Sequence, residues 1–252
     1  MIVDFHVHPR LDEPVETPRR LLALGAPLGI ELMLLLGDVL RFGYQPDEGQ
    51  IQQINDDTLA ALDRWPQAFR GLCHVNPGHD PAFVRAEIER CLAHPLMRGV
   101  KLEVSVNARD ARLDPIMAEL QRRGRILLHH AWYKTTGRVA EESTPADIAA
   151  LARRWPAVRI VMAHLTPAGP RGVQDVRPHA NVWVDTSGAQ PVAGMVEYGV
   201  RELGAERLVF GSDAPGRDLA VQLARVLGAD LTEAQRQLIL RENALRLLGE
   251  PC

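Results

Sequence analysis

Short apolar runs alternate with longer amphipathic stretches along the whole chain. The apolar runs are four to seven residues long and rich in Val, Ile and Leu, which is typical of parallel strands buried on both faces. We predict eight such strands, at 1–5, 30–36, 69–75, 99–104, 125–130, 158–163, 181–184 and 207–211.

The stretches between these runs space their apolar residues three and four positions apart, which predicts amphipathic helices. Two of them begin with clear start signals, because Asp80 precedes Pro81 and Thr144 precedes Pro145, each a capping residue before a first-turn proline. We predict helices at 17–24, 51–64, 81–92, 113–123, 144–154, 218–227 and 232–249, and a less regular helix at 171–179.

This alternation over 252 residues predicts an α/β fold, namely a (β/α)8 TIM barrel that forms a single domain over residues 1–252. Alternation alone does not distinguish a closed barrel from an open doubly wound sheet, which is the alternative. No linker, fixed-period repeat or low-complexity segment divides the chain.

Composition and charge narrow the classes of partner. Apolar residues make up 46% of the chain and charged residues 24%, which excludes a disordered protein. The 29 Lys and Arg do not exceed the 32 Asp and Glu, so we expect neither a nucleic-acid nor a membrane partner. No secretory signal or apolar run of about 20 residues is present, and cysteine is sparse (Cys73, Cys91 and Cys252), so we expect a cytoplasmic protein.

Histidines and one aspartate follow several of the predicted strands. The first strand runs into His6 and His8, whose period-two spacing lets both rings reach one point. In a barrel the carboxyl ends of all strands meet at one face, where imidazoles and a carboxylate can hold a divalent ion. The residues in question are His6, His8, His129 or His130, His164 and Asp213.

The motifs at these strand ends resemble those of the amidohydrolase superfamily, and most closely its amidohydrolase 2 branch of metal-dependent TIM-barrel hydrolases. They are DFHVH at 4–8, GVKLE at 99–103, HAW at 130–132, AHL at 163–165 and FGSD at 210–213. The resemblance implies a metal held by His6, His8, His130, His164 and Asp213. It aligns His130 rather than His129, because related sequences follow the fifth-strand histidine with a residue and then Trp.

The number of metal ions depends on the fourth strand. Superfamily members with two ions place a carboxylated lysine or a glutamate there, and this sequence has both Lys101 and Glu103 on one face. We expect one or two ions per chain, Zn²⁺ first with Mn²⁺ as the alternative. Glu103 is the better candidate for a second ion, because Lys101 would have to be carboxylated.

Loops beside these motifs supply candidate substrate contacts. Arg41 and Tyr44 lie in the loop after the second strand, and Trp132, Lys134 and Glu142 lie in the long loop after the fifth. The DTSG motif at 185–188 follows the seventh strand, where related sequences have the same motif, and a role in the pocket is expected for it.

The predicted function is metal-dependent hydrolysis of a small molecule. A metal-activated water would attack an amide, lactone or ester carbonyl, with Asp213 as general base and then acid. The first alternative is a metal-dependent decarboxylase of a small carboxylated substrate, and a non-catalytic metal-binding barrel is the second. The sequence does not determine the oligomeric state, and a homodimer is the assembly considered, since barrels of this kind often pair.

Overall fold

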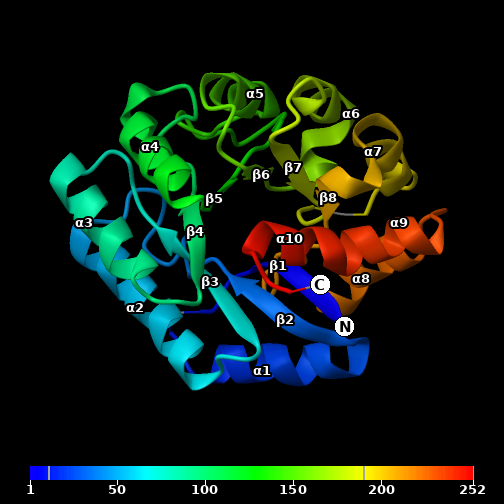
Figure 1. The fold of residues 1–252 in the computed structure, drawn as a ribbon, viewed down its shortest axis with the longest axis horizontal. Helices are drawn as coiled ribbons and strands as arrows, with labels where there is room; N and C mark the ends of the chain where they lie inside the picture. The colour runs from blue at the N-terminus through cyan, green and yellow to red at the C-terminus, as the bar shows by residue number, and fades with distance from the viewer. Residues whose placement is uncertain (11, 190, 252) are drawn as a thin grey trace.

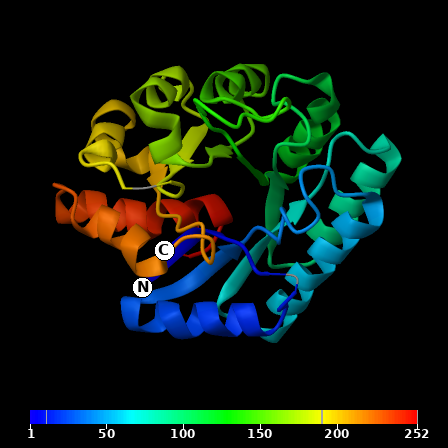
Figure 2. The ribbon, with the colours of Figure 1, turned by 180° about the vertical axis from the view of Figure 1, so that it is seen from behind.

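Eight parallel strands form one sheet in chain order, and helices surround it (Figure 1). The computed structural model describes residues 1–10, 12–189 and 191–251, so Cys252 lies outside the described residues. Figure 2 shows the same ring of strands from its other end. The predicted single-domain (β/α)8 barrel is confirmed. The strands are β1 Ile2–Val7, β2 Ile30–Leu35, β3 Phe69–His74, β4 Met97–Leu102, β5 Ile126–His129, β6 Ile160–Met162, β7 Val182–Asp185 and β8 Leu208–Val209.

The helices lie outside the strands, as the amphipathic pattern predicts. Asp80 and Thr144 cap α3 and α5 as expected: Asp80 Oδ1 accepts the Ala82 amide, and Thr144 forms a capping box with Asp147, whose carboxylate accepts the Thr144 amide. They are α1 Glu16–Gly25, α2 Glu48–Arg64, α3 Pro81–Leu92, α4 Asp114–Arg123, α5 Pro145–Arg154, α6 Leu165–Val176, α7 Met195–Leu203, α8 Leu219–Leu227, α9 Glu233–Gln237 and α10 Asn243–Leu248. Within the described residues, no helix has the length and apolar character needed to cross a membrane.

Two predicted helices differ from the observed ones. The stretch 232–249 is not one α-helix, because a π-helical turn at Leu238–Glu242 separates α9 from α10. The helix expected at 171–179 begins earlier, at Leu165, and contains a kink at Gly169 just before Pro170. Proline cannot donate a backbone hydrogen bond and Gly169 adopts a positive φ of 63°, so the helix is interrupted there and continues beyond it.

The barrel closes between its first and last strands. The Phe5 amide donates to the Phe210 carbonyl over 2.8 Å, and Val7 forms an isolated parallel bridge with Ala214. Inside the ring, Val3 and Phe5 pack in an apolar cluster that also contains Leu245 of α10. Figure 1 shows α10 lying across the ring of strands, so this helix covers one end of the barrel.

The end of the chain is fastened to the barrel by charged groups. The Glu250 carboxylate accepts from Arg70 Nε over 2.6 Å and also pairs with Arg98. These hydrogen bonds, from Arg70 first, lower the pKa of Glu250 to about 2. A depressed carboxyl pKa stabilises the fold above the unfolded-state pKa of 4.5, and this contribution is lost as pH falls towards 2.

We therefore predict that Glu250→Gln lowers the free energy of unfolding by about 1–3 kcal/mol at neutral pH. The difference from the parent protein should shrink between about pH 5 and about pH 2, as urea unfolding at several pH values would measure. Glu16→Gln, which removes an exposed carboxylate from α1, is the control and should change stability little. A pH-independent effect of Glu250→Gln would contradict the assignment.

A buried ion pair lies at the carboxyl end of β4, between Lys101 of that strand and Glu103 just beyond it. Lys101 is fully buried, and its Nζ lies 2.5 Å from Glu103 Oε1. Burial raises the pKa of Glu103, but the Lys101 ammonium and His130 outweigh it and keep the pKa below its usual range. The predicted placement of both side chains on one face is therefore observed, and each charge compensates the other.

Removing one member of this pair should cost more than removing both. Lys101→Met leaves a buried carboxylate without its cation, and we predict a loss of about 3–5 kcal/mol of unfolding free energy. Lys101→Met/Glu103→Gln should recover most of that loss in urea unfolding of the metal-free protein. Equal stability of the single and double variants would show that the two charges are not coupled.

Candidate metal centre

A cavity of about 600 Å³ opens beyond the carboxyl ends of the strands. It contains all the predicted ligands except Lys101, and all the predicted substrate contacts. Its lining includes His6, His8, Glu103, His130, His164 and Asp213 among the first set, and Arg41, Tyr44, Trp132, Lys134 and Glu142 among the second. Arg10, Asp38 and Arg217 also line it and were not among the predicted residues.

His6 and His8 point at each other from β1 and the residue just beyond it. Their Nε2 atoms lie 3.0 Å apart. The opposite nitrogen of each ring contacts an oxygen: His6 Nδ1 lies 2.7 Å from Asp185 Oδ2, and His8 Nδ1 lies 2.7 Å from the Gly37 carbonyl. A carbonyl and an ionised carboxylate only accept hydrogen bonds, so each Nδ1 carries the proton and each Nε2 presents a lone pair.

An irregularity of β1 presents His6 in this way. The register of β1 against β2 shifts between Asp4 and Val7. Asp4 supports the shift, since its Oδ1 accepts the His6 amide over 3.1 Å and the Ser212 amide over 2.9 Å. Gly211 gives His6 room, because a Cβ at that position would lie only 2.8 Å from the His6 Cβ.

Asp213 completes a group with these two histidines. Its Oδ1 lies 3.7 Å from His6 Nε2 and 3.6 Å from His8 Nε2, and ligand atoms of the three residues all lie within 4.8 Å of one another. Asp213 has a positive φ of 64°, and its amide donates to the His6 carbonyl over 2.7 Å. Such a backbone conformation is costly for a residue other than glycine, and the contact with β1 holds it.

His130 and His164 form a second facing pair. His130 Nδ1 lies 3.2 Å from His164 Nε2, and His130 Nε2 lies 2.8 Å from the buried Glu142 carboxylate. His164 Nδ1 lies 2.9 Å from the Ser187 hydroxyl. The neighbouring His129 does not line the cavity, since its Nδ1 contacts the His130 carbonyl over 2.7 Å.

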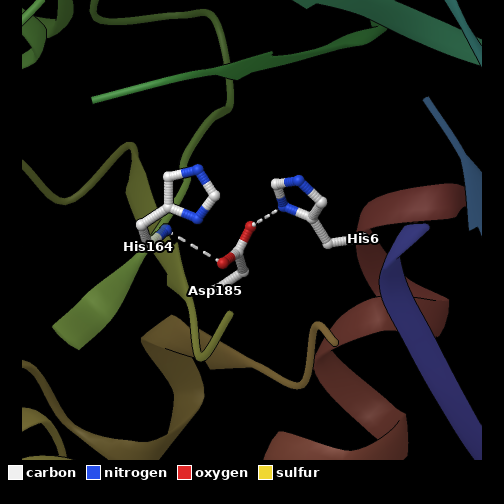
Figure 3. A group of neighbouring side chains, drawn as sticks. All are labelled: His6, His164 and Asp185. Atoms are coloured by element: carbon white, nitrogen blue, oxygen red, sulfur yellow. Dashed lines mark hydrogen bonds and ion pairs between the residues drawn. The ribbon is translucent and has the colours of Figure 1, made fainter. Parts of the chain in front are cut away.

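A further group is made of two residues that line the cavity, His6 and His164, and of Asp185, which does not (Figure 3). Figure 3 shows the Asp185 carboxylate between the two histidines, with one oxygen directed at the His6 ring and the other at the His164 backbone. The expected role for the 185–188 motif is therefore seen only in part, because Asp185 contacts cavity residues without lining the cavity.

The charges and donors present fit a divalent cation. Burial and the neighbouring His6 lower the pKa of His8 to about 4, and burial lowers the pKa of His164 well below its usual value. Burial opposes the charged form of His6, but the Asp185 carboxylate outweighs it and raises the pKa of His6. Positive charge is therefore favoured where His6 Nε2 and His8 Nε2 face each other over 3.0 Å, and a divalent cation between them supplies it. Each ring also has an oxygen on its outer nitrogen, as metal-binding histidines commonly have. The described residues thus contain a His/His/Asp metal-binding group.

The cavity wall is cationic and aromatic. Lys134 Nζ lies 2.8 Å from Glu142 Oε1 and 5.3 Å from the centre of the Trp132 ring, so this lysine is held against both. Arg41 lies 4.0 Å from the Asp12 carboxylate, and Arg217 Nε lies 3.9 Å from Asp213 Oδ2. Arg217 follows Asp213 by four residues, and that spacing was the only sequence signal for it.

The chain resembles several known proteins. Over residues 3–249 it matches the sequence profile of the family described as Amidohydrolase. The γ-resorcylate decarboxylase of Rhodococcus jostii (strain RHA1) is 24% identical over 249 residues, covering 78% of this chain and 75% of that protein. The structure of 5-carboxyvanillate decarboxylase from Sphingomonas paucimobilis matches with a TM-score of 0.77 and 16% identity over 99% of both chains.

A dihydroxybenzoic acid decarboxylase from Polaromonas sp. JS666 is also similar, with a TM-score of 0.76 and 18% identity over 98% of this chain and 96% of that one. Its structure contains manganese and the inhibitor 2-nitroresorcinol. The named relatives are decarboxylases, so the prediction of a hydrolase, with a metal-bound water attacking a carbonyl, is wrong. The preference for zinc is not supported either, because the metal of the Polaromonas structure is manganese.

The family profile covers nearly the whole barrel, from the first residues of β1 to the end of α10. The strand-end motifs occur in the order that the resemblance predicted, and the structure brings their histidines and Asp213 to one cavity. The chain therefore belongs to the amidohydrolase family.

Proposed function

We propose that this protein is a metal-dependent decarboxylase of a small hydroxylated aromatic acid. The observation that carries the proposal is the cavity itself, which combines the His6, His8 and Asp213 group with cationic and aromatic walls. The named relatives support it, since they act on γ-resorcylate, 5-carboxyvanillate and dihydroxybenzoate. The proposed unit is the single barrel over residues 1–252.

We place the metal at His6, His8 and Asp213, with His130 and His164 as the further donors of the same cavity. Manganese is the ion that the Polaromonas structure supports. When bound, such an ion acts as a Lewis acid that orients substrate oxygens and stabilises negative charge developing on them.

One ion per chain agrees best with the contacts on β4. Lys101 Nζ already pairs with Glu103 Oε1 over 2.5 Å, so the lysine acts as a cation there. Carboxylation would turn Lys101 into an anion beside the Glu103 carboxylate, and the two like charges would repel each other in a buried site. We therefore assign this pair to the support of the cavity rather than to a second ion.

The walls suit a carboxylated ring. Arg41 is half-exposed at the cavity mouth, where its guanidinium can bind a carboxylate with two parallel hydrogen bonds. Trp132 and Tyr44 can pack on an aromatic ring. Lys134 is held by Glu142 and keeps positive charge on the same wall.

Asp213 is the group that we propose to move the proton. Its carboxylate lies 3.6 Å from His8 Nε2, 3.7 Å from His6 Nε2 and 3.9 Å from Arg217 Nε, and its side chain is 21% exposed. Its carboxyl oxygen would give a proton to the ring carbon that bears the substrate carboxylate. The bond from that carbon to the carboxylate then breaks, its electrons return to the ring, and CO₂ leaves. Solvent returns the proton to Asp213.

The reaction gives a direct test. Manganese-loaded protein should release ¹³CO₂ from one or more carboxyl-labelled hydroxybenzoates, including 2,6-dihydroxybenzoate, and in D₂O the product should gain one deuteron at the vacated carbon. Asp213→Asn should lower kcat by about 10²–10⁴. No CO₂ from any of these acids, with manganese bound, would contradict the proposal and favour a binding protein.

The role of Arg41 is tested separately. Arg41→Gln should raise KM by about 10–100-fold while kcat changes little, because a charge-assisted hydrogen bond to the substrate carboxylate is lost. Arg19→Gln, on α1 and exposed, is the matched control and should leave KM unchanged. A fall in kcat at unchanged KM would show that Arg41 acts on the reaction rather than on binding.

For the cellular setting we propose the cytoplasm, on the sparse cysteines of the sequence. The two cysteines of the described residues, Cys73 and Cys91, are buried free thiols, which agrees with a reducing compartment. The homodimer stays a prediction, which sedimentation or scattering in solution would measure.

A further inference from the structure

Asp185 stands out because one buried carboxylate holds two of the histidines. It is the last residue of β7 and is fully buried. Its Oδ2 contacts His6 Nδ1 over 2.7 Å, whereas its Oδ1 accepts the His164 and Ser187 amides, each over 3.0 Å (Figure 3). The Ser187 hydroxyl donates a very short hydrogen bond to the same Oδ1.

We infer that Asp185 is a positioning residue that fixes the ring of His6 and the backbone of His164, and that it is not itself a ligand of the metal. The inference rests on the metal site proposed above, but the hydrogen bonds on which it depends are those of this chain alone. His6 belongs to two groups that could hold a metal, one with His8 and Asp213 and one with His164 and Asp185. The inference assigns the metal to the first group.

The first effect of Asp185 is on the His6 tautomer. An acceptor beside Nδ1 keeps the proton on that nitrogen and leaves the lone pair on Nε2. His6 Nε2 is the atom that faces His8 and Asp213. The carboxylate therefore directs the metal-binding nitrogen of His6 into the cavity from behind the ring.

Its second effect is on His164. This residue has a left-handed backbone, with φ 77° and ψ 74°, which is costly for any residue other than glycine. The hydrogen bond from its amide to Asp185 Oδ1 helps to hold that conformation. Because the Ser187 hydroxyl donates to Asp185, its oxygen is free to accept from His164 Nδ1, which leaves His164 Nε2 with a lone pair towards the cavity.

The same contacts argue against Asp185 as a ligand. Oδ1 already accepts three donors, and Oδ2 accepts the His6 ring N–H, so both oxygens are engaged by groups of the chain itself. The side chain does not line the cavity. Gly211 permits this close packing, since a Cβ there would lie 3.3 Å from Asp185 Cβ and 2.8 Å from His6 Cβ.

Asp185→Asn gives a test with a definite expected orientation. Two backbone amides face the position of Oδ1 and cannot become acceptors, so the asparagine oxygen should occupy that side. The asparagine NH₂ would then face His6 Nδ1 at the closer contact, 2.7 Å, against 3.2 Å for the Ser187 hydroxyl oxygen on the same nitrogen. Nδ1 should therefore accept from the amide, and the His6 proton would move to Nε2.

The first readout is ¹⁵N NMR of histidine-labelled, metal-free protein, recorded at rising pH until the His6 ring is neutral, because the Asp185 carboxylate outweighs burial and raises the pKa of His6. His6, assigned with His6→Gln, should carry its proton on Nδ1 in the parent protein and on Nε2 in Asp185→Asn. The control is Asp147→Asn, which alters another buried carboxylate with several hydrogen bonds but none to a histidine, and it should leave His6 unchanged. An unchanged His6 tautomer in Asp185→Asn would overturn the inference.

The second readout is Mn²⁺ binding by calorimetry. Asp185→Asn should bind about one ion with an affinity lowered by about 10–100-fold, as expected for loss of a group that orients a ligand. Unchanged affinity, or complete loss of binding while His6 keeps its proton on Nδ1, would overturn the inference. A parent protein that binds no Mn²⁺ would contradict the proposed function, whereas the metal-free NMR comparison would still decide the role of Asp185.

If Asp185→Asn does not fold, Ser187→Ala replaces it. This variant keeps the carboxylate and removes the hydroxyl that lies between Asp185 and His164. It should change the ¹⁵N signals of the His164 ring and leave the His6 proton on Nδ1. Unchanged His164 signals, or movement of the His6 proton, would overturn the inference.

Discussion

The closure of the barrel between β1 and β8 is the constraint on which the site depends. The His6 carbonyl accepts the Asp213 amide over 2.7 Å, and the Ala214 carbonyl accepts the His8 amide over 2.7 Å. These two hydrogen bonds bring together residues from opposite ends of the chain. Without closure, as in an open sheet, β1 and β8 need not be neighbours, and the group of His6, His8 and Asp213 would not form.

Polar residues inside this closed barrel require partners, and the pattern of those partners gives the site its chemistry. Four imidazoles each have one nitrogen on an oxygen of the chain and the other directed at the cavity. The oxygens come from Gly37, Glu142, Asp185 and Ser187, which lie on three different loops or strand ends. The hydrogen bonds that satisfy the outer ring nitrogens therefore also orient the inner ring nitrogens towards the cavity.

The sequence predicts the barrel well because strands buried on both faces appear as continuous apolar runs. The proposed metal ligands are also visible, because they follow these runs directly. The sequence predicts less well what depends on tertiary contacts. The break between α9 and α10 and the kink at Gly169 interrupt otherwise helical patterns. Asp185 lies 179 positions from His6, so its contact with that ring is not visible in local spacing. Arg217 follows Asp213 by only four residues, but it lies in a loop, where spacing alone does not show that it lines the cavity. The choice of reaction depends on the substrate, and there the sequence-based prediction of hydrolysis was wrong.

Anomalous X-ray diffraction at the manganese edge, from crystals of the manganese-loaded protein, tests the central claim most directly. The account predicts one strong peak per chain, in contact with His6 Nε2, His8 Nε2 and the Asp213 carboxylate, with the Asp185 carboxylate still bound to His6 Nδ1. A peak on Asp185, a second peak beside Glu103, or no peak in the cavity would contradict it.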